Sequence, residues 1–445
     1  MGEAIANTST PWIAGSRWTK TFFFLTAAMS STILLKVQQI QYLELLYFVQ
    51  LAILAYVFAK NQYQVSWFRP YFKIAIYYLI FCLVAIILSF ASLRYDFYYP
   101  PELNVLKYPV VITMSRVAEL LASVFIMLYL ATKFRDDETA ARFTMRVYFW
   151  VGFASGFFSI LTFPLNLAGF DLGTYSDSHR MRGFYNEGGP YGLYVLSVFL
   201  VGISLYRLDW EKKGKLRFAF AVLSIAFIGS QSKAAFVAIL AMFLLNGFLS
   251  QSVGRRLAFV SGAVVFLVLI SQVVDLAEGI RIYQQAGEAY ERASRLHPDD
   301  ANFVYGRVAG AFLVPRMIEA HPVTGVGWGN YGIIRNAPEY RGASYWADIS
   351  DDPGLGLFGT TAELGLPLTL YLMVCLFLPY VYLRRKKAPL FLTNLVLLQP
   401  VVHIFGAQLN LTYPWILTSF ALGITYAKAS NASSEGSALI TLPSN

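Results

Sequence analysis

Charged residues are scarce in this chain. Asp, Glu, Lys and Arg together make up 14% of its 445 residues, whereas soluble domains carry roughly 25%. A water-facing surface cannot be built from so few charges, which excludes an ordinary soluble protein. Apolar residues reach 57% and aromatic residues 16%, and runs of about 20 apolar residues, each long enough to cross a bilayer as a helix, recur along the chain. The composition therefore predicts an all-α, polytopic bundle of transmembrane helices.

Cysteine and histidine are scarce as well, with two and four residues. Cys82 and Cys375 each lie inside an apolar run, so we expect neither a disulfide framework nor a metal site. The net charge of +9 does not indicate nucleic-acid binding, because the basic residues fall in short clusters between apolar runs, as in loops that flank membrane spans. We therefore expect membrane lipids, and no nucleic acid, among the partners.

The apolar runs predict about twelve spans. The run Thr21–Leu35 is taken as a span and not as a signal peptide, because no small-residue cleavage site follows it. Two short runs are separated only by Gly229–Ser232, and a break at membrane depth is tolerated where protein or water covers the freed backbone groups. The predicted spans are residues 21–35, 42–59, 71–92, 109–132, 144–165, 190–206, 218–229, 233–249, 257–274, 355–383, 389–409 and 412–427.

Basic residues predict the orientation of this bundle. One set of connections holds several times as many Lys and Arg as the opposite set, and the richer set is expected in the cytoplasm. Both termini then lie in the cytoplasm, and the long segment 275–354 lies on the other side, which is the periplasm if the host is a Gram-negative bacterium. The predicted parts are an N-terminal bundle of about nine spans, a large periplasmic loop with amphipathic helices, the C-terminal spans and a disordered cytoplasmic tail, at residues 1–274, 275–354, 355–427 and 428–445.

The long loop contains two helical patterns. Residues 279–296 place apolar side chains at helical spacing with charges between them, which is typical of a helix lying on a membrane surface. A second helix is predicted over Arg307–Ala320 and ends at His321-Pro322. The alternating glycines of Gly325–Tyr331 follow, but the dinucleotide-binding fingerprint needs a strand before it and a helix after it. Neither is predicted, so that type of site is excluded.

Arginines on the outer face are candidates for anion binding, because a guanidinium fork matches the geometry of phosphate. Arg180, Arg182, Arg316 and Arg341 are the candidates. Lys233 begins a helix, where backbone N–H groups and the helix dipole favour an anion. The alternative roles are anchoring of lipid headgroups for Arg180 and Arg182, and snorkelling or helix pairing for Lys233.

Four segments carry a family resemblance. In order along the chain, Arg182–Glu187, Ser232–Ala234, Arg307–Tyr331 and Ala362–Leu366 resemble the motifs of the O-antigen ligase and Wzy O-antigen polymerase family. The resemblance implies a metal-independent, inverting glycosyltransferase of the GT-C type that needs no cofactor and uses undecaprenyl-diphosphate-linked glycans at the outer face of the inner membrane. It also implies that Lys233 and Arg307 grip the lipid diphosphate, although the family usually has Arg at the place of Lys233.

The sequence departs from the ligases of that family at one place. Gly354 stands where a catalytic His would precede the matched glycine, Gly365, and this favours the polymerase branch. Asp351 and Asp352 lie close to the vacated position, and either serves as a general base if partial burial raises its pKa. A turn before Pro353 is the alternative role for both.

Two further positions bear on the site. His321 is another candidate base or substrate ligand, with a structural role at a helix end as its alternative. Charges inside a membrane span indicate function by default. Arg116 and Glu119, however, are spaced to pair with each other, which favours a structural role. Glu363 lies just inside the span after the loop, where it is placed to orient a loop arginine.

The function expected from the resemblance is polymerisation of lipid-linked oligosaccharide repeat units into O-antigen, capsule or exopolysaccharide. A polysaccharide chain-length regulator is the expected partner. Fixed cations in a water-poor cleft stabilise the charge on a departing diphosphate without metal or nucleotide. A ligase is the alternative within this class. A flippase for the same lipid-linked oligosaccharide is the alternative from another class, although transporters are usually built from repeated halves and this chain shows no internal repeat.

Overall fold

The computed structural model describes most of the chain, and nearly all of the described part is helical. A short antiparallel ladder joins β1 (Lys36–Val37) to β2 (Ile40–Gln41). Because helices make up nearly all of the described part, the structure confirms the predicted all-α class. The described residues are 23–28, 36–37, 40–41, 52, 71–92, 108–168, 180–183, 185, 188–248, 253–271, 307–341, 355–404, 409 and 412–438.

The helices of the described part lie mostly on predicted apolar runs, apart from the three in the loop segment 275–354. In chain order they are α3 (Phe72–Ser92), α4 (Pro109–Asp136), α5 (Glu138–Leu167), α6 (Gly188–Arg207), α7 (Lys213–Gly229), α8 (Lys233–Phe248), α9 (Val253–Ser271), α12 (Arg307–Ala320), α13 (Tyr331–Ile334), α14 (Pro338–Arg341), α15 (Leu357–Arg385), α16 (Leu390–Ile404) and α17 (Thr412–Ala438).

The boundary between α4 and α5 shows how local chemistry sets helix ends. α4 begins with Pro109, whose fixed φ suits a first helical position. It ends with Lys133 and Arg135 in its last turn, where the dipole favours positive charge. Asp137 separates the two helices, and its Oδ1 accepts a 3.1 Å hydrogen bond from the backbone N–H of Ala140, which caps the start of α5.

Five of the described helices are long and apolar enough to cross a bilayer. These are α3, α4, α5, α6 and α15, and the bent pair of α7 and α8 raises the number to six when it counts as one span. α16, with 15 residues, is a shorter apolar helix. Most of the predicted runs 21–35 and 42–59 lie outside the described residues. The structure thus confirms a helical membrane protein, and the total of twelve spans stays a prediction.

The outward surface of the helices is apolar. On α3, Leu83 is 59% exposed and Ile87 is 57% exposed, whereas Tyr78 and Phe81 on the same helix are fully buried. α15 likewise exposes Leu370 at 57%. A soluble protein would expose large apolar patches of this kind only at an interface, whereas a transmembrane helix presents them to lipid.

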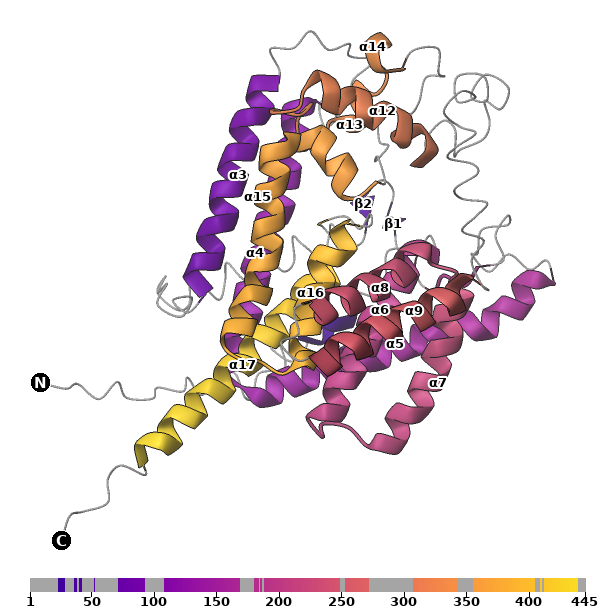
Figure 1. The fold of residues 1–445 in the computed structure, drawn as a ribbon, viewed down its shortest axis with the longest axis vertical. Helices are drawn as coiled ribbons and strands as arrows, with labels where there is room; N and C mark the ends of the chain where they lie inside the picture. Colours follow the sequence, from indigo (N-terminus) through magenta and orange to yellow (C-terminus); the bar gives the residue numbers. More distant parts are fainter. Residues whose placement is uncertain are drawn as a thin grey trace, which may run out of the picture.

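The C-terminal helices hold the two halves of the bundle together. α17 packs along α4, and α16 packs against α17, α6 and α8 (Figure 1). The approach of α17 to α4 is close, because a Cβ atom on Gly423 would lie 2.8 Å from the carbonyl oxygen of Ala131. α17 continues to Ala438, beyond the end of the predicted span at 427.

The start of α3 and the end of α15 meet at Tyr426 of α17. Tyr71, just before α3, packs edge-on against Tyr426 of α17 at 5.6 Å. Nζ of Lys386, which follows α15, lies 5.8 Å from the centre of the Tyr426 ring. At the opposite end of α3 and at the start of α4, Ser89 and Thr113 form hydrogen bonds to Trp328. The described part of the long loop therefore lies opposite Lys386.

Candidate functional site

The break between α7 and α8 is the centre of the first candidate site. The two helices are bent by 118° relative to each other across residues 230–232, at the break that the sequence predicts. Gln231 adopts a positive φ of 47° at the turn. Ser230 and Ser232 are both buried.

Hydrogen bonds to neighbouring segments cover the backbone groups at this break. The N–H of Met181 donates to the carbonyl oxygen of Gly229 at 2.8 Å. The Ser232 hydroxyl donates to the carbonyl oxygen of Gly189 at 2.7 Å and accepts from the N–H of Ala235 at 3.1 Å. Ser232 is therefore the N-cap of α8, and the break is closed by protein, as a break at membrane depth requires.

Glycines allow α6 to approach the break closely. A Cβ atom on Gly188 would lie 2.6 Å from the carbonyl oxygen of Ser230, and one on Gly192 would overlap the side chain of Ser232. The N-termini of α6 and α8 therefore lie beside each other. Both carry the positive end of a helix dipole.

Three basic side chains accompany these two helix starts. Arg180 and Arg182 flank Met181, which is bonded to the break, and both are half-buried. Lys233 is the first residue of α8, and its side chain is exposed. Tyr185 anchors the same segment, because its buried ring packs against Tyr194 at 5.4 Å between ring centres. The structure thus gathers three of the predicted anion-binding residues at one junction.

The described part of the long loop forms a second region, which begins with α12. Its bounds, Arg307–Ala320, match the predicted helix. Nη1 of Arg316 donates a 2.8 Å hydrogen bond to the carbonyl oxygen of Tyr340. Nε2 of His321 lies 2.8 Å from the Tyr340 hydroxyl. Arg316 and His321, both predicted substrate ligands, therefore also hold α14 against α12.

His321 is half-buried at this contact. Burial disfavours the charged imidazolium and lowers the pKa of His321, an effect that the Glu339 carboxylate opposes. A neutral ring at pH 7 retains one acceptor nitrogen, which is what a general base requires.

The glycine-rich segment after His321 is joined to a break in α15. Gly365 has φ of 73° inside that helix, and Pro367 has no N–H to give to the carbonyl oxygen of Glu363. That oxygen accepts instead from the N–H of Gly327 at 2.9 Å, and the oxygen of Ala362 accepts from Val326 at 2.9 Å. In return, the N–H of Leu366 donates to the carbonyl oxygen of Pro322 at 2.8 Å.

This backbone exchange, which we term the glycine clasp (residues 322–327 and 362–366), requires glycine at two positions. Gly325 and Gly365 both have positive φ, and a Cβ atom on either would overlap the backbone of the opposite segment of the clasp. Close backbone packing therefore explains Gly325 and Gly365. At Gly327 and Gly329, which also have positive φ, a Cβ atom would instead overlap the side chains of Asn330 and Ile112.

Trp328 and Glu363 fix the clasp to its surroundings. The N–H of Trp328 donates to Ser89 Oγ at 3.2 Å, and its carbonyl oxygen accepts from Thr113 at 2.9 Å. Oε1 of Glu363 accepts from the N–H of Tyr331 at 3.3 Å. Glu363 was predicted to orient a loop arginine, and in the structure it bonds the first backbone N–H of α13.

The remaining predicted residues are placed in part. Arg307 begins α12 and Arg341 ends α14, but their side chains lie outside the described part. Asp351 and Asp352 are outside it altogether, as is the predicted helix 279–296. α12 packs against α15 and α14, whereas α8 packs against α9, α6 and α16. In Figure 1, α12 lies near the end of α3 and α15, well separated from α8.

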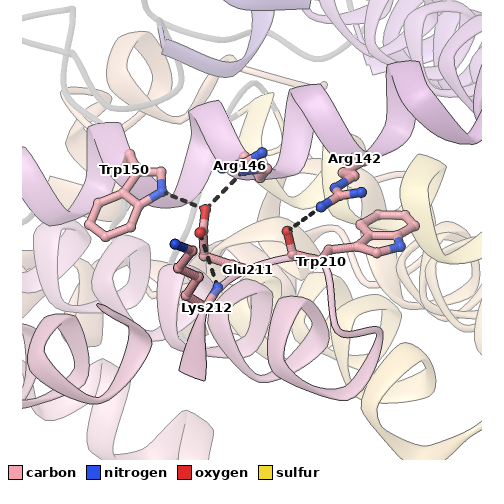
Figure 2. Close-up of polar contacts among 6 residues, drawn as sticks. All are labelled: Arg142, Arg146, Trp150, Trp210, Glu211 and Lys212. Carbon is pink, nitrogen blue, oxygen red and sulfur yellow. Dashed lines mark hydrogen bonds and ion pairs between the residues drawn. The ribbon is translucent and has the colours of Figure 1, made fainter. Parts of the chain in front are cut away.

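A third polar cluster lies at the other end of α6 and α7. Oε2 of Glu211 accepts from Arg146 at 2.8 Å and from the Trp150 indole at 3.3 Å, while Oε1 accepts from the N–H of Lys212 at 3.1 Å (Figure 2). Desolvation would raise the pKa of Glu211, but these three donors, with the charge of Arg146, outweigh it and lower the pKa.

The first and third clusters lie at opposite ends of α6. α6 has 20 residues, about 30 Å at 1.5 Å per residue. Arg180, Arg182 and Lys233 lie by its start, and the Glu211 cluster lies beyond its end. The sequence assigns these two sets of basic residues to opposite faces of the membrane.

The predicted pair inside α4 is also present, since Nη1 of Arg116 lies 3.2 Å from Oε2 of Glu119.

Within the described ranges, no group of three or more His, Cys, Asp and Glu side chains is arranged to hold a metal ion. Cys82 and Cys375 are buried free thiols.

Comparison of the chain with protein-family models and with curated proteins finds no match.

Proposed function

We propose that this chain is a membrane polymerase that joins undecaprenyl-diphosphate-linked oligosaccharide repeat units into a surface polysaccharide. The observation that carries the proposal is the junction at residues 229–233. Two helix N-termini lie beside each other there, and Arg180, Arg182 and Lys233 lie on the segments that meet at this point. Helix dipoles and basic residues on adjoining segments suit a diphosphate.

The proposed topology places this junction at the outer face of a bacterial inner membrane. In this arrangement about twelve spans cross the bilayer, both termini are cytoplasmic, and the segment 275–354 is periplasmic. The separation of basic residues along α6 supports it, because the Lys- and Arg-rich connections belong in the cytoplasm. A lipid-linked donor whose diphosphate lies at the outer leaflet would reach Lys233 without entering the cytoplasm.

The proposed reaction is an inverting glycosyl transfer. A hydroxyl oxygen of the acceptor unit bonds to the anomeric carbon of the donor sugar, the bond from that carbon to the diphosphate oxygen breaks, and the hydroxyl proton passes to a base. Negative charge develops on the departing diphosphate, where fixed cations stabilise it. Asp351, Asp352 and His321 are the proposed candidates for the base. Lys233 is proposed to hold the diphosphate at the junction, and Arg307, at the start of the separate helix α12, is proposed to contact the same substrate from the second region.

Reconstitution tests the proposal directly. Purified protein is incubated with lipid-diphosphate repeat units in the absence of nucleotide and metal, and products are separated as a ladder. We expect wild type to form the ladder and Lys233→Ala and Arg307→Ala to reduce its rate by about 100-fold or more, as for the loss of one transition-state donor. Lys215→Ala is the matched control, since Lys215 is exposed at the far end of α7.

The product distinguishes the competing functions. Transfer of finished polymer to a lipid A-core or protein acceptor, without elongation, would identify a ligase. Movement of repeat units across vesicles without any new glycosidic bond would identify a flippase. Equal rates for Lys233→Ala, Arg307→Ala and Lys215→Ala would contradict the proposed role of the first two residues.

A further inference from the structure

A groove runs along α5 at the end opposite the helix break. Its volume is about 840 Å³, within the range of about 300–1,000 Å³ that is usual for small-molecule sites. Side chains of α5 form most of its wall, and Phe24 of the helical segment 23–28 adds one side. The lining residues are Phe24, Thr139, Arg142, Phe143, Arg146, Val147, Trp150, Val151 and Ala154.

The groove is apolar along most of its length. Phe143, Val147, Val151 and Ala154 recur at spacings of four, four and three residues, which places them on one stripe of a helix. Phe143 and Ala154 are exposed. The stripe is therefore a surface that an acyl chain can cover.

The end of the groove nearest the start of α5 is basic. Arg146 is paired with Glu211, but Nη2 of Arg142 donates to a neutral acceptor, the carbonyl oxygen of Trp210, at 3.1 Å. Among the described residues Arg142 forms no ion pair. Figure 2 shows Arg142, Arg146 and Trp150 pointing from α5 toward the connection between α6 and α7. The other donors of the Arg142 fork are available for an anion.

We propose that this groove binds an anionic phospholipid, with its phosphate at Arg142 and one acyl chain along Phe143–Ala154. A free phosphate would gain nothing from the apolar stripe. A zwitterionic lipid offers the guanidinium a phosphate whose charge is offset by its own ammonium group, so an anionic lipid gains more. Trp150 supports placing the lipid phosphate at this level of the bilayer, since tryptophan favours the boundary between headgroups and hydrocarbon. Lys213, Lys215 and Arg217 at the start of α7 add positive charge on the same end of the bundle, as in basic lipid sites between transmembrane helices. The proposal does not depend on the enzymatic function.

Native mass spectrometry of the purified protein tests this site. The protein is equilibrated in detergent with phosphatidylglycerol or with phosphatidylcholine, and retained lipid is counted. We expect wild type to retain phosphatidylglycerol preferentially, and Arg142→Gln to weaken that retention about tenfold, as for loss of one charge-assisted hydrogen bond. Arg385→Gln removes an exposed arginine from the end of α15 and should leave retention unchanged.

A second variant addresses the acyl chain without removing charge. Ala154→Trp fills the apolar end of the groove and should also reduce retention of phosphatidylglycerol, while keeping Arg142 intact. Inorganic phosphate added to wild type should not displace the lipid. Equal losses in Arg142→Gln and Arg385→Gln, equal retention of both lipids, or displacement by inorganic phosphate would each overturn the proposal.

Discussion

Nε of Arg146 lies 2.8 Å from Oε2 of Glu211, and the glutamate side chain is only 4% exposed. The ion pair joins α5 to the connection between α6 and α7, and it fixes the end of the bundle that carries the groove. A buried carboxylate of this kind is stable only while its donors remain.

Replacement of Glu211 by Gln should destabilise the protein. The amide keeps the size of the side chain but removes the charge that Arg146 and the Trp150 indole bond, which costs about 1–3 kcal/mol. Thermal unfolding in detergent, followed by tryptophan fluorescence, measures the loss. Asp209→Asn is the control, because the pair of Asp209 with Lys213 is exposed and worth little. A shift as large in the control would contradict the role of Glu211.

The same pair predicts a pH dependence. The folded-state pKa of Glu211 is lowered, so its contribution is complete above its unfolded-state pKa of about 4.3. That contribution is lost as the pH falls through the folded-state pKa. The stability of wild type minus that of Glu211→Gln should therefore be constant near neutrality and shrink below about pH 4. A difference that grows on acidification would refute this assignment.

Alanine at either glycine of the clasp should impair folding. Gly325→Ala and Gly365→Ala each force a non-glycine residue into positive φ, which costs about 1–3 kcal/mol, and each adds a steric overlap with the backbone opposite. Lower unfolding temperatures and faster proteolysis between α12 and α15 are the readouts. Gly214→Ala is the control, since nothing lies within 4 Å of a Cβ atom there. Wild-type stability in both clasp variants would show that the exchange is dispensable.

Removal of the cap at the helix break should weaken the start of α8. Ser232→Ala leaves the N–H of Ala235 without its acceptor, a loss of about 0.5–2 kcal/mol. Ser224→Ala serves as the comparison, because the exposed Ser224 hydroxyl bonds only the carbonyl oxygen of Phe220 in its own helix. Hydrogen exchange at residues 233–236 should rise in the first variant alone. Identical exchange in both variants would argue against a capping role.

Thiol labelling can determine the orientation. The native thiols Cys82 and Cys375 are buried, so a membrane-impermeant maleimide should report on introduced cysteines. We expect Lys233→Cys and Val323→Cys to react once the reagent reaches the periplasm. Lys215→Cys and Arg385→Cys should react only after the inner membrane is opened. Reaction of all four from one side would exclude the proposed topology.

The sequence predicted features that depend on local pattern. Helix spacing located Arg307–Ala320 to the residue, and the cluster of Gly and Ser at 229–232 marked the break. The i,i+3 spacing of Arg116 and Glu119 indicated their pairing. Each of these signals lies within a few residues of chain, where periodicity and turn chemistry act.

The contacts that assemble the regions could not be predicted in the same way. The bond from Met181 to Gly229 and the bond from Val326 to Ala362 join residues far apart in sequence, and helical periodicity carries no information about such partners.

The glycine clasp also limits how this protein can be recombined. Because Pro367 has no N–H, the carbonyl oxygen of Glu363 takes its hydrogen bond from Gly327 of the loop segment. The carbonyl oxygen of Pro322 in turn accepts from the N–H of Leu366. A chimera that exchanges the loop but keeps the host α15, or the reverse, would leave these groups unmatched. Grafting between relatives should therefore transfer residues 321–331 together with 360–368 as one unit.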